Sequence, residues 1–424
     1  MVASTPSRDE LRRRFTEVRR RTDALARPLS AEDCGLQSMP DASPTKWHLA
    51  HTTWFFETFA LLPLGEAPFH PRYGFLFNSY YEAEGPRQER SRRGLLSRPS
   101  LEDVRRYRAD VDHRVQKALD EMSPERFAEL GPVIELGLHH EQQHQELILT
   151  DILHALAGSP LRPAYRDTAP SRRAAPDPGP MAWIAYDEGV RQIGHDGAGF
   201  AFDNEGPRHS VYQRAYLLAD RLVTCGEYLG FMENGGYNRP DLWLSDGWNA
   251  VKSERWTMPL YWARRGDSFE EATLDGVRSV VTNEPVCHLS YYEADAFTRW
   301  AGARLPTEAE WEIAAAGASV QGTFADSLAL YPRHATPQEG ASRHPRQLFG
   351  DVWQWTASAY SAYPGFRPAD GALGEYNGKF MCNQLVLRGG SCATPASHIR
   401  ASYRNFFPPG ARWQFSGLRL ARDA

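Results

Sequence analysis

The chain has 424 residues, of which 42% are hydrophobic and 24% charged, and its formal net charge is -5. This length allows two or three domains with sizeable cores, and the near-balanced charge argues against a nucleic-acid or acidic-membrane partner. No apolar run reaches the roughly 18 residues of a membrane span, and the first residues lack the apolar stretch of a signal peptide. The five cysteines show no CxxC spacing, so we expect a cytoplasmic protein.

The first part of the chain, residues 8–160, is predicted to be helical. Residues 8–26 form a charged helix, and Pro44 precedes a second, strongly apolar helix with the sequence TKWHLAHTTWFFETFALL. A third helix opens at Ser100. Its apolar residues recur at helical spacing, at Val104, Tyr107, Val111, Val115 and Leu119. With the helix that follows, these segments predict a four-helix bundle.

The fourth predicted helix, residues 132–157, carries the sequence HHEQQHQE within an apolar pattern. Its apolar residues are Ile134, Leu138, Leu147, Ile152, Leu153 and Leu156. His140 and His144 are four residues apart, so both imidazoles project from one face of the helix. Such a pair is half of a transition-metal site, although a solvated histidine pair has the same spacing. A third ligand from the second helix would be His51 or His48, in the bundle core.

A long loop, residues 70–99, separates the second and third predicted helices. It is rich in aromatic and arginine side chains, namely Tyr80, Tyr81, Arg87, Arg90, Arg92, Arg93 and Arg98. Long loops in compact domains are usually functional or disordered. Guanidinium groups bind carboxylates through two parallel hydrogen bonds, so we interpret the loop as a carboxylate-binding segment, with a solvated basic loop as the alternative.

The composition changes after the fourth helix. Residues 161–180 are rich in Pro, Ala and Arg and are predicted to be an extended linker. Residues 181–424 show short strand patterns, many glycines and abundant tryptophan. Helices are expected at 291–301 and from Thr307, where Thr-Glu-Ala-Glu matches a capping box. The sequence therefore predicts an α+β protein whose second domain, residues 181–424, is dominated by loops.

Several motifs in order along the second domain carry a resemblance to a known family. They are Glu284-Pro285-Val286 with SYYEADAFTRW, ARLPTEAEWE from Ala303, FGDVWQWT from Phe349, LRGGS from Leu387, and SGLRLARD from Ser416. This set resembles the formylglycine-generating-enzyme (sulfatase-modifying-factor) fold, which is C-type-lectin-like. The WHLAH and HHEQQHQE segments resemble the DinB-like bundle of the ergothioneine-biosynthetic sulfoxide synthases. The resemblance covers nearly the whole chain.

The resemblance implies a mononuclear non-haem iron(II) enzyme. Such an enzyme uses dioxygen to join a thiol, cysteine or gamma-glutamylcysteine, to carbon 2 of hercynine, and oxidises the sulfur to a sulfoxide. The iron ligands carry over to His51, His140 and His144, with His48 and His139 as alternatives. No nucleic acid, membrane or obligate protein partner is expected.

The same resemblance assigns residues to the substrates. Arg87 and Arg90 match a pair that holds the carboxylate of the thiol substrate. The hercynine segment carries over to Asn405, Phe406, Phe407, Trp413 and Gln414, although core packing explains the two phenylalanines equally well. Gln384 is also assigned to substrate binding.

The chain departs from its relatives in two places. Some relatives have Asn-Trp at Asn405-Phe406, and they have a catalytic tyrosine where this chain has Gln384. Because that tyrosine is missing, we expect Tyr80 or Tyr81 to donate the proton, unless both rings only pack the loop.

Other functions on the same scaffold stay open at this stage. A selenoneine synthase and an ovothiol-type synthase, which acts at a different imidazole carbon, are the nearest alternatives, and a non-catalytic lectin-like protein is a more distant one. A copper-dependent formylglycine-generating activity is rejected, because Cys382 and Cys392 are ten residues apart and give no sign of a close pair.

Overall fold

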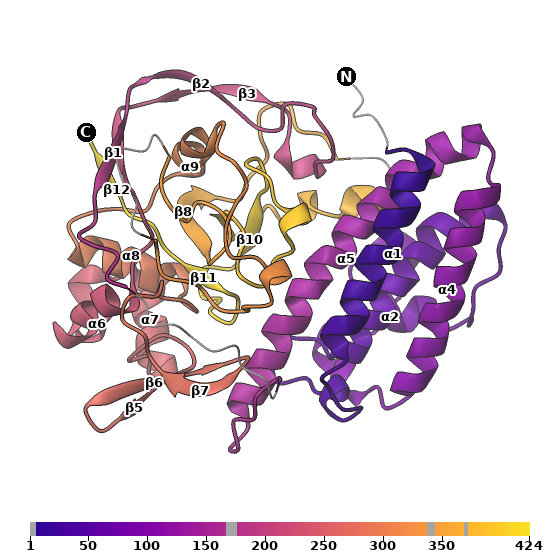
Figure 1. Cartoon of the computed structure of the whole chain (residues 1–424), viewed down its shortest axis with the longest axis horizontal. Helices are drawn as coiled ribbons and strands as arrows, with labels where there is room; N and C mark the ends of the chain where they lie inside the picture. Colours follow the sequence, from indigo (N-terminus) through magenta and orange to yellow (C-terminus); the bar gives the residue numbers. More distant parts are fainter. Residues whose placement is uncertain (1–5, 167–175, 337–343, 369–371) are drawn as a thin grey trace. The chain divides into compact units, whose positions relative to one another are not determined.

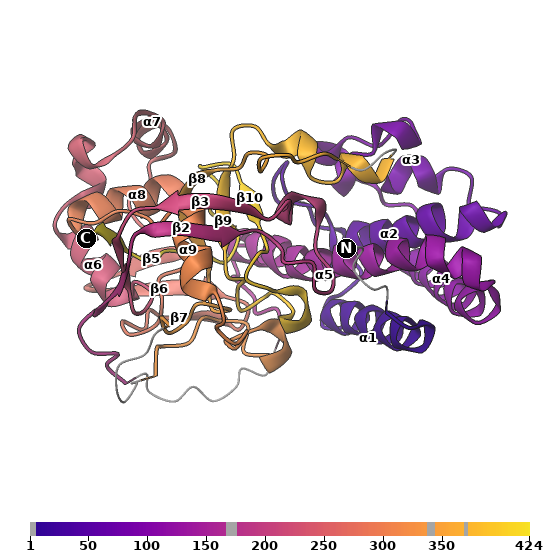
Figure 2. The same cartoon turned by 90° about the horizontal axis from the view of Figure 1, so that it is seen from above.

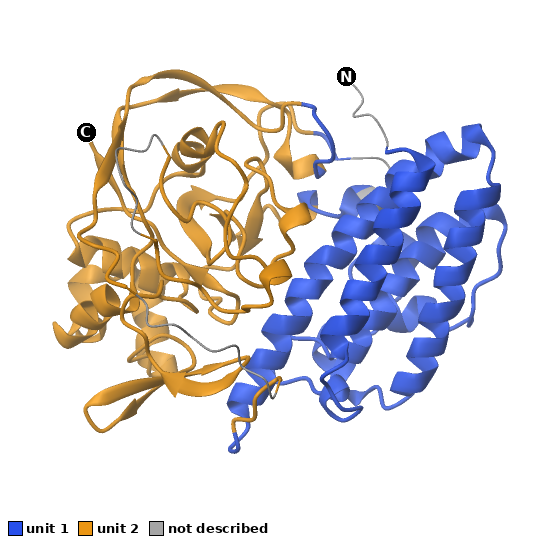
Figure 3. Cartoon of the chain, in the orientation of Figure 1, with its two compact units in different colours: residues 1–161, 197–202, 367–378 blue, residues 162–196, 203–366, 379–424 orange. Residues whose placement is uncertain are grey.

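The computed structural model describes residues 6–166, 176–336, 344–368 and 372–424. Spatial contacts divide the chain into two compact units, which Figure 3 colours separately. The helical unit comprises residues 1–161, 197–202 and 367–378, and the mixed unit comprises residues 162–196, 203–366 and 379–424. The predicted domain limits, 1–160 and 181–424, stay a prediction. Residues 167–175 of the predicted linker, which spans 161–180, lie outside the described residues.

Within its described residues, the helical unit has four long helices, which lie side by side in Figures 1 and 2. They are α1 (Arg8–Ala26), α2 (Thr45–Phe56), α4 (Leu101–Glu121) and α5 (Pro124–Gly158), with the short α3 (Tyr73–Phe77) inside the long loop. The predicted bundle is confirmed. Ser100 caps α4 in a capping box with Asp103, in which each side chain accepts a hydrogen bond from the other residue's backbone N–H.

Helix α5 begins eight residues earlier than the predicted start at Pro132. Ser123 accepts a hydrogen bond from the Arg126 amide, and Pro124 stands at the first helical position, where its missing N–H costs nothing. Pro132 therefore lies inside the helix, and the boundary placed there from sequence was wrong.

The predicted apolar faces form the core of the helical unit. Leu11 and Phe15 of α1 are fully buried, as are Val104 and Val111 of α4. On α5, Leu138 is buried at the level of the histidine motif, and Leu147 alone among its predicted apolar residues is half-buried. Burial of these faces holds the four helices together.

The described residues of the mixed unit form four small sheets. The first joins β1 (Trp183–Tyr186), β4 (Tyr216–Ala219) and β12 (Ala421–Asp423), all antiparallel. The second has the order β10 (Asn405–Phe407), β9 (Leu385–Arg388), β8 (Trp353–Ala359) and β11 (Ser416–Gly417), with β11 parallel to β8. The remaining strands are β2 (Gly189–Ile193) with β3 (His209–Gln213), and β5 (Trp262–Arg265), β6 (Ser268–Thr273) and β7 (Gly276–Ser279).

Four helices accompany these sheets in the described part of the mixed unit. They are α6 (Cys225–Glu233), α7 (Ser245–Glu254), α8 (Tyr291–Trp300) and α9 (Glu308–Ala315). The predictions of α8 and of the Thr307 capping box of α9 are confirmed, as is the α+β class. Helices α6 and α7 were not predicted from the sequence.

Structural constraints explain the arginine and the first glycine of the LRGGS motif. Arg388 is completely buried and donates a hydrogen bond to Glu312 at 2.7 Å. The next residue, Gly389, has a φ of 100°, and a Cβ there would lie 2.5 Å from the Leu348 carbonyl oxygen. Only glycine fits at such a position.

Across the described residues, every helix is too short or too polar to cross a membrane.

Candidate metal centre

Three buried histidines converge between α2 and α5. The Nε2 atom of His140 lies 3.2 Å from Nε2 of His51 and 3.1 Å from Nε2 of His144. In the part of the chain that the structure describes, this trio is the group of His, Cys, Asp or Glu side chains placed to hold a metal ion. His140 and His144 share one face of α5, as their four-residue spacing predicts, and His51 comes from the facing helix.

Hydrogen bonds fix which nitrogen of two of these imidazoles carries the proton. Nδ1 of His51 lies 2.5 Å from the carbonyl oxygen of Phe77, which can only accept. His51 therefore carries its proton on Nδ1, and Nε2 presents a lone pair to the centre.

A second chain of contacts does the same for His144. Nε2 of His48 lies 3.1 Å from the Asp151 carboxylate, and Nδ1 of His48 lies 2.8 Å from Nδ1 of His144. Since the carboxylate accepts the His48 proton at Nε2, Nδ1 of His48 is an acceptor. His144 then donates through Nδ1, and its Nε2 presents a lone pair.

The donor set fits a metal cation. Nε2 of His140 faces the Nε2 lone pairs of His51 and His144, and a single proton on His140 could satisfy only one of the two. A cation instead accepts a lone pair from each of the three imidazoles. Burial lowers the pKa of His140 to about 3 and those of His51 and His144 well below the usual range, so the imidazoles are neutral ligands. A set of three imidazoles suits iron, zinc, copper or nickel.

Aromatic rings enclose His51. The Trp47 ring stacks on the imidazole with 4.5 Å between centroids, and the Trp54 ring is also nearly parallel at 5.5 Å. The Arg93 guanidinium lies 3.4 Å above the Trp47 ring. This packing limits rotation of the imidazole and keeps water away from one side of the centre.

His140-Glu141-Gln142-Gln143-His144 has the spacing of a zinc-protease motif, in which the glutamate acts as a general base. Here Glu141 is completely buried and accepts hydrogen bonds from Arg19 and Arg108, at 2.9 and 2.6 Å, and from Thr22 at 2.6 Å. A carboxylate engaged in this way does not reach a substrate. The geometry thus argues against metalloprotease chemistry.

A segment that is distant in the sequence completes the helical unit around α5. The Tyr376 hydroxyl donates to the amide oxygen of Gln143, and its ring meets the His140 ring with 5.6 Å between centroids. The neighbouring Glu375 carboxylate accepts the backbone N–H groups of Glu82 and Ala83, at 3.0 and 2.9 Å. These contacts could not be predicted from the sequence, because more than 200 residues separate Tyr376 from Gln143 and no motif links them.

The two tyrosines predicted from the loop lie close to this segment. Tyr81 is completely buried, and its ring packs 5.6 Å from the Trp54 ring. Tyr80 stacks on Tyr81 at 4.6 Å and meets the Tyr376 ring edge-on at 6.2 Å. The three phenols therefore form one cluster, of which Tyr376 lies against a candidate ligand.

The two predicted arginines lie on the same loop and keep part of their side chains exposed. Arg87 pairs with Glu82, and Arg90 donates to the backbone carbonyl of Asp41. The Arg87 side chain is 33% exposed and that of Arg90 is 51% exposed.

The remaining predicted residues belong to the mixed unit. Gln384 lies just before β9, and its carbonyl oxygen accepts the amide of Tyr360 at 2.8 Å. The Phe406 ring stacks on the Tyr360 ring at 4.0 Å, and the Phe407 ring meets Trp413 edge-on at 5.9 Å. The other two are Asn405 on β10 and the buried Gln414.

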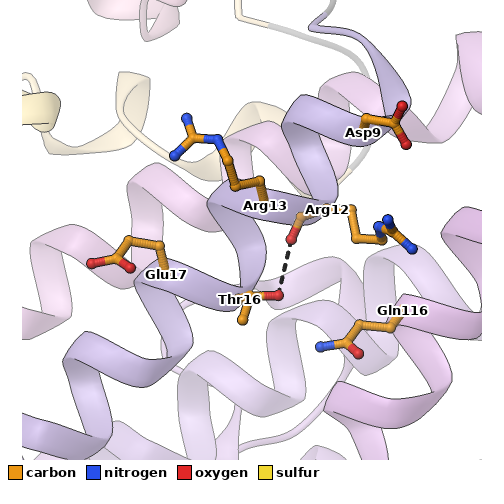
Figure 4. Close-up of a pocket in the computed structure, with 6 residues that line it drawn as sticks. All are labelled: Asp9, Arg12, Arg13, Thr16, Glu17 and Gln116. Carbon is orange, nitrogen blue, oxygen red and sulfur yellow. Dashed lines mark hydrogen bonds between the residues drawn. The ribbon is translucent and has the colours of Figure 1, made fainter.

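A surface pocket lies elsewhere on the helical unit, between α1 and α4 (Figure 4). It is lined by Asp9, Arg12, Arg13, Thr16, Glu17 and Gln116. Thr16 uses its hydroxyl to donate to the Arg12 carbonyl at 3.1 Å, and most of these side chains are exposed. The pocket has no histidine and no buried polar group, so it has no part in the candidate centre.

Two family models match different parts of the chain. The DinB superfamily matches residues 14–148, and the sulfatase-modifying factor enzyme 1-like domain matches residues 171–345 and 344–424. A hercynine oxygenase of Mycolicibacterium thermoresistibile is 31% identical over 99% of this chain and 96% of its own. A hercynine oxygenase of Mycobacterium tuberculosis is 32% identical over 98% and 99%. The formylglycine-generating enzyme of Streptomyces coelicolor is 29% identical, over 60% of this chain and 96% of its own.

The chain is thus a two-domain protein of the class that joins a DinB-type bundle, here with a buried three-histidine centre, to a sulfatase-modifying-factor domain. The chain belongs to the hercynine oxygenase family, the sulfoxide synthases of ergothioneine biosynthesis.

Proposed function

We propose that the protein is a mononuclear non-haem iron(II), dioxygen-dependent sulfoxide synthase, which joins cysteine or gamma-glutamylcysteine to carbon 2 of hercynine. The observation that carries the proposal is the convergence of three neutral imidazoles, those of His51, His140 and His144. Nε2 of His140 lies 3.2 Å from Nε2 of His51 and 3.1 Å from Nε2 of His144. The names of the full-length relatives support hercynine as the substrate.

The three histidines would hold the iron through Nε2. Bound iron supplies the activation of dioxygen and a coordination site for the thiolate sulfur. The chain supplies fixed geometry, because the Phe77 carbonyl and His48 orient two of the imidazoles. Fixed geometry favours a reaction of several components, since bound reactants lose little further entropy.

Arg87 and Arg90 would bind the carboxylate of the thiol substrate. Their partly exposed side chains suit this role, and a substrate carboxylate would replace Glu82 as the partner of Arg87. Hercynine would use Gln384, Asn405, Phe406, Phe407, Trp413 and Gln414. Gln384 immediately precedes β9, which pairs with β10. The quaternary ammonium group of hercynine cannot donate hydrogen bonds, and aromatic faces bind such groups well.

The proton donor in this proposal is Tyr80 or Tyr81. Both phenols are protonated at neutral pH, as a proton donor must be, and burial raises the pKa of Tyr81 well above its usual value. Tyr376 has a different role, because its hydroxyl proton is engaged by Gln143. We assign Tyr376 to orienting that amide.

The proposal is tested with the purified chain, iron(II) and air. Hercynine is supplied with cysteine, with gamma-glutamylcysteine or with a selenosugar, and products are identified by mass spectrometry and NMR. The expected product is a sulfoxide joined at carbon 2 of the imidazole, formed by the wild type and not by His51→Ala. Attachment at another carbon would indicate an ovothiol-type enzyme, a selenium product from the selenosugar would indicate a selenoneine synthase, and no product from any pair would refute the synthase.

A further inference from the structure

Behind His144, two side chains that take no part in the proposed ligand set form a continuous line of contacts. Nδ1 of His144 lies 2.8 Å from Nδ1 of His48, and Nε2 of His48 lies 3.1 Å from Oδ2 of Asp151. His48 and Asp151 are both buried, so water does not compete for these hydrogen bonds. The same Asp151 oxygen accepts the backbone N–H of Ser43 at 2.8 Å, which holds the carboxylate in place.

We propose that His48 and Asp151 are positioning residues of the metal centre, which together fix the tautomer and the orientation of His144. This inference rests on the proposed metal-binding function. The carboxylate takes the proton on Nε2 of His48, which makes Nδ1 of His48 an acceptor. That acceptor takes the proton on Nδ1 of His144 and leaves the lone pair on Nε2.

The other two imidazoles have different arrangements. His51 is oriented by the carbonyl oxygen of Phe77, which cannot change its role as an acceptor. Nδ1 of His140 is buried and has no hydrogen-bond partner within the described residues. An imidazole as the immediate partner of His144 could adopt either tautomer, so the Asp151 carboxylate is needed to select one.

Three substitutions separate this role from simple packing. His48→Leu keeps the volume but removes the acceptor for His144. His48→Asn places an amide oxygen two bonds from Cβ, as Nδ1 is in histidine, and so restores the acceptor. Asp151→Asn keeps an oxygen for the Ser43 amide but removes the charge. His154→Asn is the control. His154 lies on α5, as Asp151 does, but its Nδ1 contacts the hydroxyl of Ser38 at 2.7 Å and not His144.

The experiment titrates the metal-free full-length chain with Co²⁺ against a competing chelator and records the visible absorption of the bound ion. Loss of an orienting partner weakens metal binding by about 10- to 100-fold. We expect a loss of this size in His48→Leu with a changed Co²⁺ spectrum, a smaller loss in Asp151→Asn, and nearly wild-type binding in His48→Asn and His154→Asn. Unfolding midpoints of the metal-free variants show that each has folded.

The outcomes distinguish this inference from the proposed function. If the wild type fails to bind one Co²⁺ per chain, or if His51→Ala binds it equally well, the three-histidine centre is wrong and the inference falls with it. If the wild type binds, His51→Ala does not, and Asp151→Asn and His48→Leu both match the wild type, the centre stands and the positioning role is overturned. A loss in His48→Asn equal to that in His48→Leu would also contradict it.

Discussion

At the scale of single residues, adjacent histidines on α5 have separate tasks. The Nε2 atom of His140 faces the other two imidazoles, whereas the ring of His139 stacks on Phe200 at 3.9 Å and accepts from Arg14 at 3.1 Å. Neighbouring positions on a helix differ by about 100° in direction, so a shift of one residue separates a ligand from a packing side chain. The sequence alone left both as candidates.

This difference gives a direct test of the ligand set. His140→Ala removes the central lone pair and should lower the iron content, measured by elemental analysis, by at least about tenfold. His139→Ala is the matched control and should keep its iron. The assignment would be refuted by an iron-replete His140→Ala together with an iron-free His139→Ala.

The phenol cluster gives a second test at this scale. The Tyr80→Phe, Tyr81→Phe double variant should form the sulfoxide at least about 100-fold more slowly and turn toward oxidation of the thiol alone, because general acids contribute that much to rates. Its iron content should be unchanged. Product ratios by mass spectrometry decide the matter, with Tyr376→Phe in parallel. If the double variant gives wild-type products and Tyr376→Phe is defective, the proton donor is Tyr376.

At the scale of elements, one buried ionic network joins three helices behind the metal centre. Glu141 of α5 binds Arg19 of α1 and Arg108 of α4, and Arg19 also donates to Asp112 at 2.6 Å. Burial alone would raise the pKa of Glu141, but Arg108 and Arg19 outweigh it and hold the value at about 2. The network therefore depends on an ionised Glu141.

The sign of the pH dependence follows from this shift. The pKa of Glu141 is lower in the folded chain than its ordinary value of 4.5, so its contribution to stability is present above about pH 4.5 and is lost as the pH falls toward 2. It amounts to roughly 3 kcal/mol at neutral pH. Urea unfolding of the wild type and Glu141→Gln across this range should give a difference that shrinks as the pH falls.

Comparing the wild type with Glu141→Gln separates the effect of Glu141 on stability from that of the histidines. Buried neutral histidines also weaken the folded state in acid, but they do so below about pH 6.5 and in both proteins alike. A difference in unfolding free energy that stays constant between pH 5 and 2.5 would mean that Glu141 is not ionised in the folded chain.

Much of the helical unit could be predicted from the sequence, because its signals are local. The helical apolar period and the Ser100 cap set α4, and the four-residue spacing of His140 and His144 put both on one face of α5. The contacts of Glu375 and Tyr376 could not be predicted. They depend on a distant segment that returns to the bundle, and no periodicity reports such a return.

At the scale of the whole molecule, the helical unit is not a continuous stretch of chain. Residues 197–202 and 367–378 belong to it, and they bring Phe200 to His139 and Tyr376 to Gln143. A fragment that ends at residue 160 lacks both segments. The bundle is therefore complete only when the later sequence is present.

We therefore expect separately expressed fragments 1–160 and 181–424 to be inactive when each is assayed alone with iron(II), hercynine and thiol. The first fragment would retain the three histidines but lose the Tyr376 contact to Gln143 and the Glu375 contacts to the loop at Glu82 and Ala83. Circular dichroism establishes that each fragment is folded. Sulfoxide formation by a folded fragment 1–160 would show that these segments are dispensable.

The proposed activity depends above all on one iron ion held by three histidines. The most direct measurement is an anomalous difference map at the iron absorption edge, from crystals of the iron-loaded full-length protein. We predict a single strong peak among the Nε2 atoms of His51, His140 and His144. A peak that His48 or His139 ligates in place of one of these three, or a peak in the mixed unit with none between α2 and α5, would contradict it.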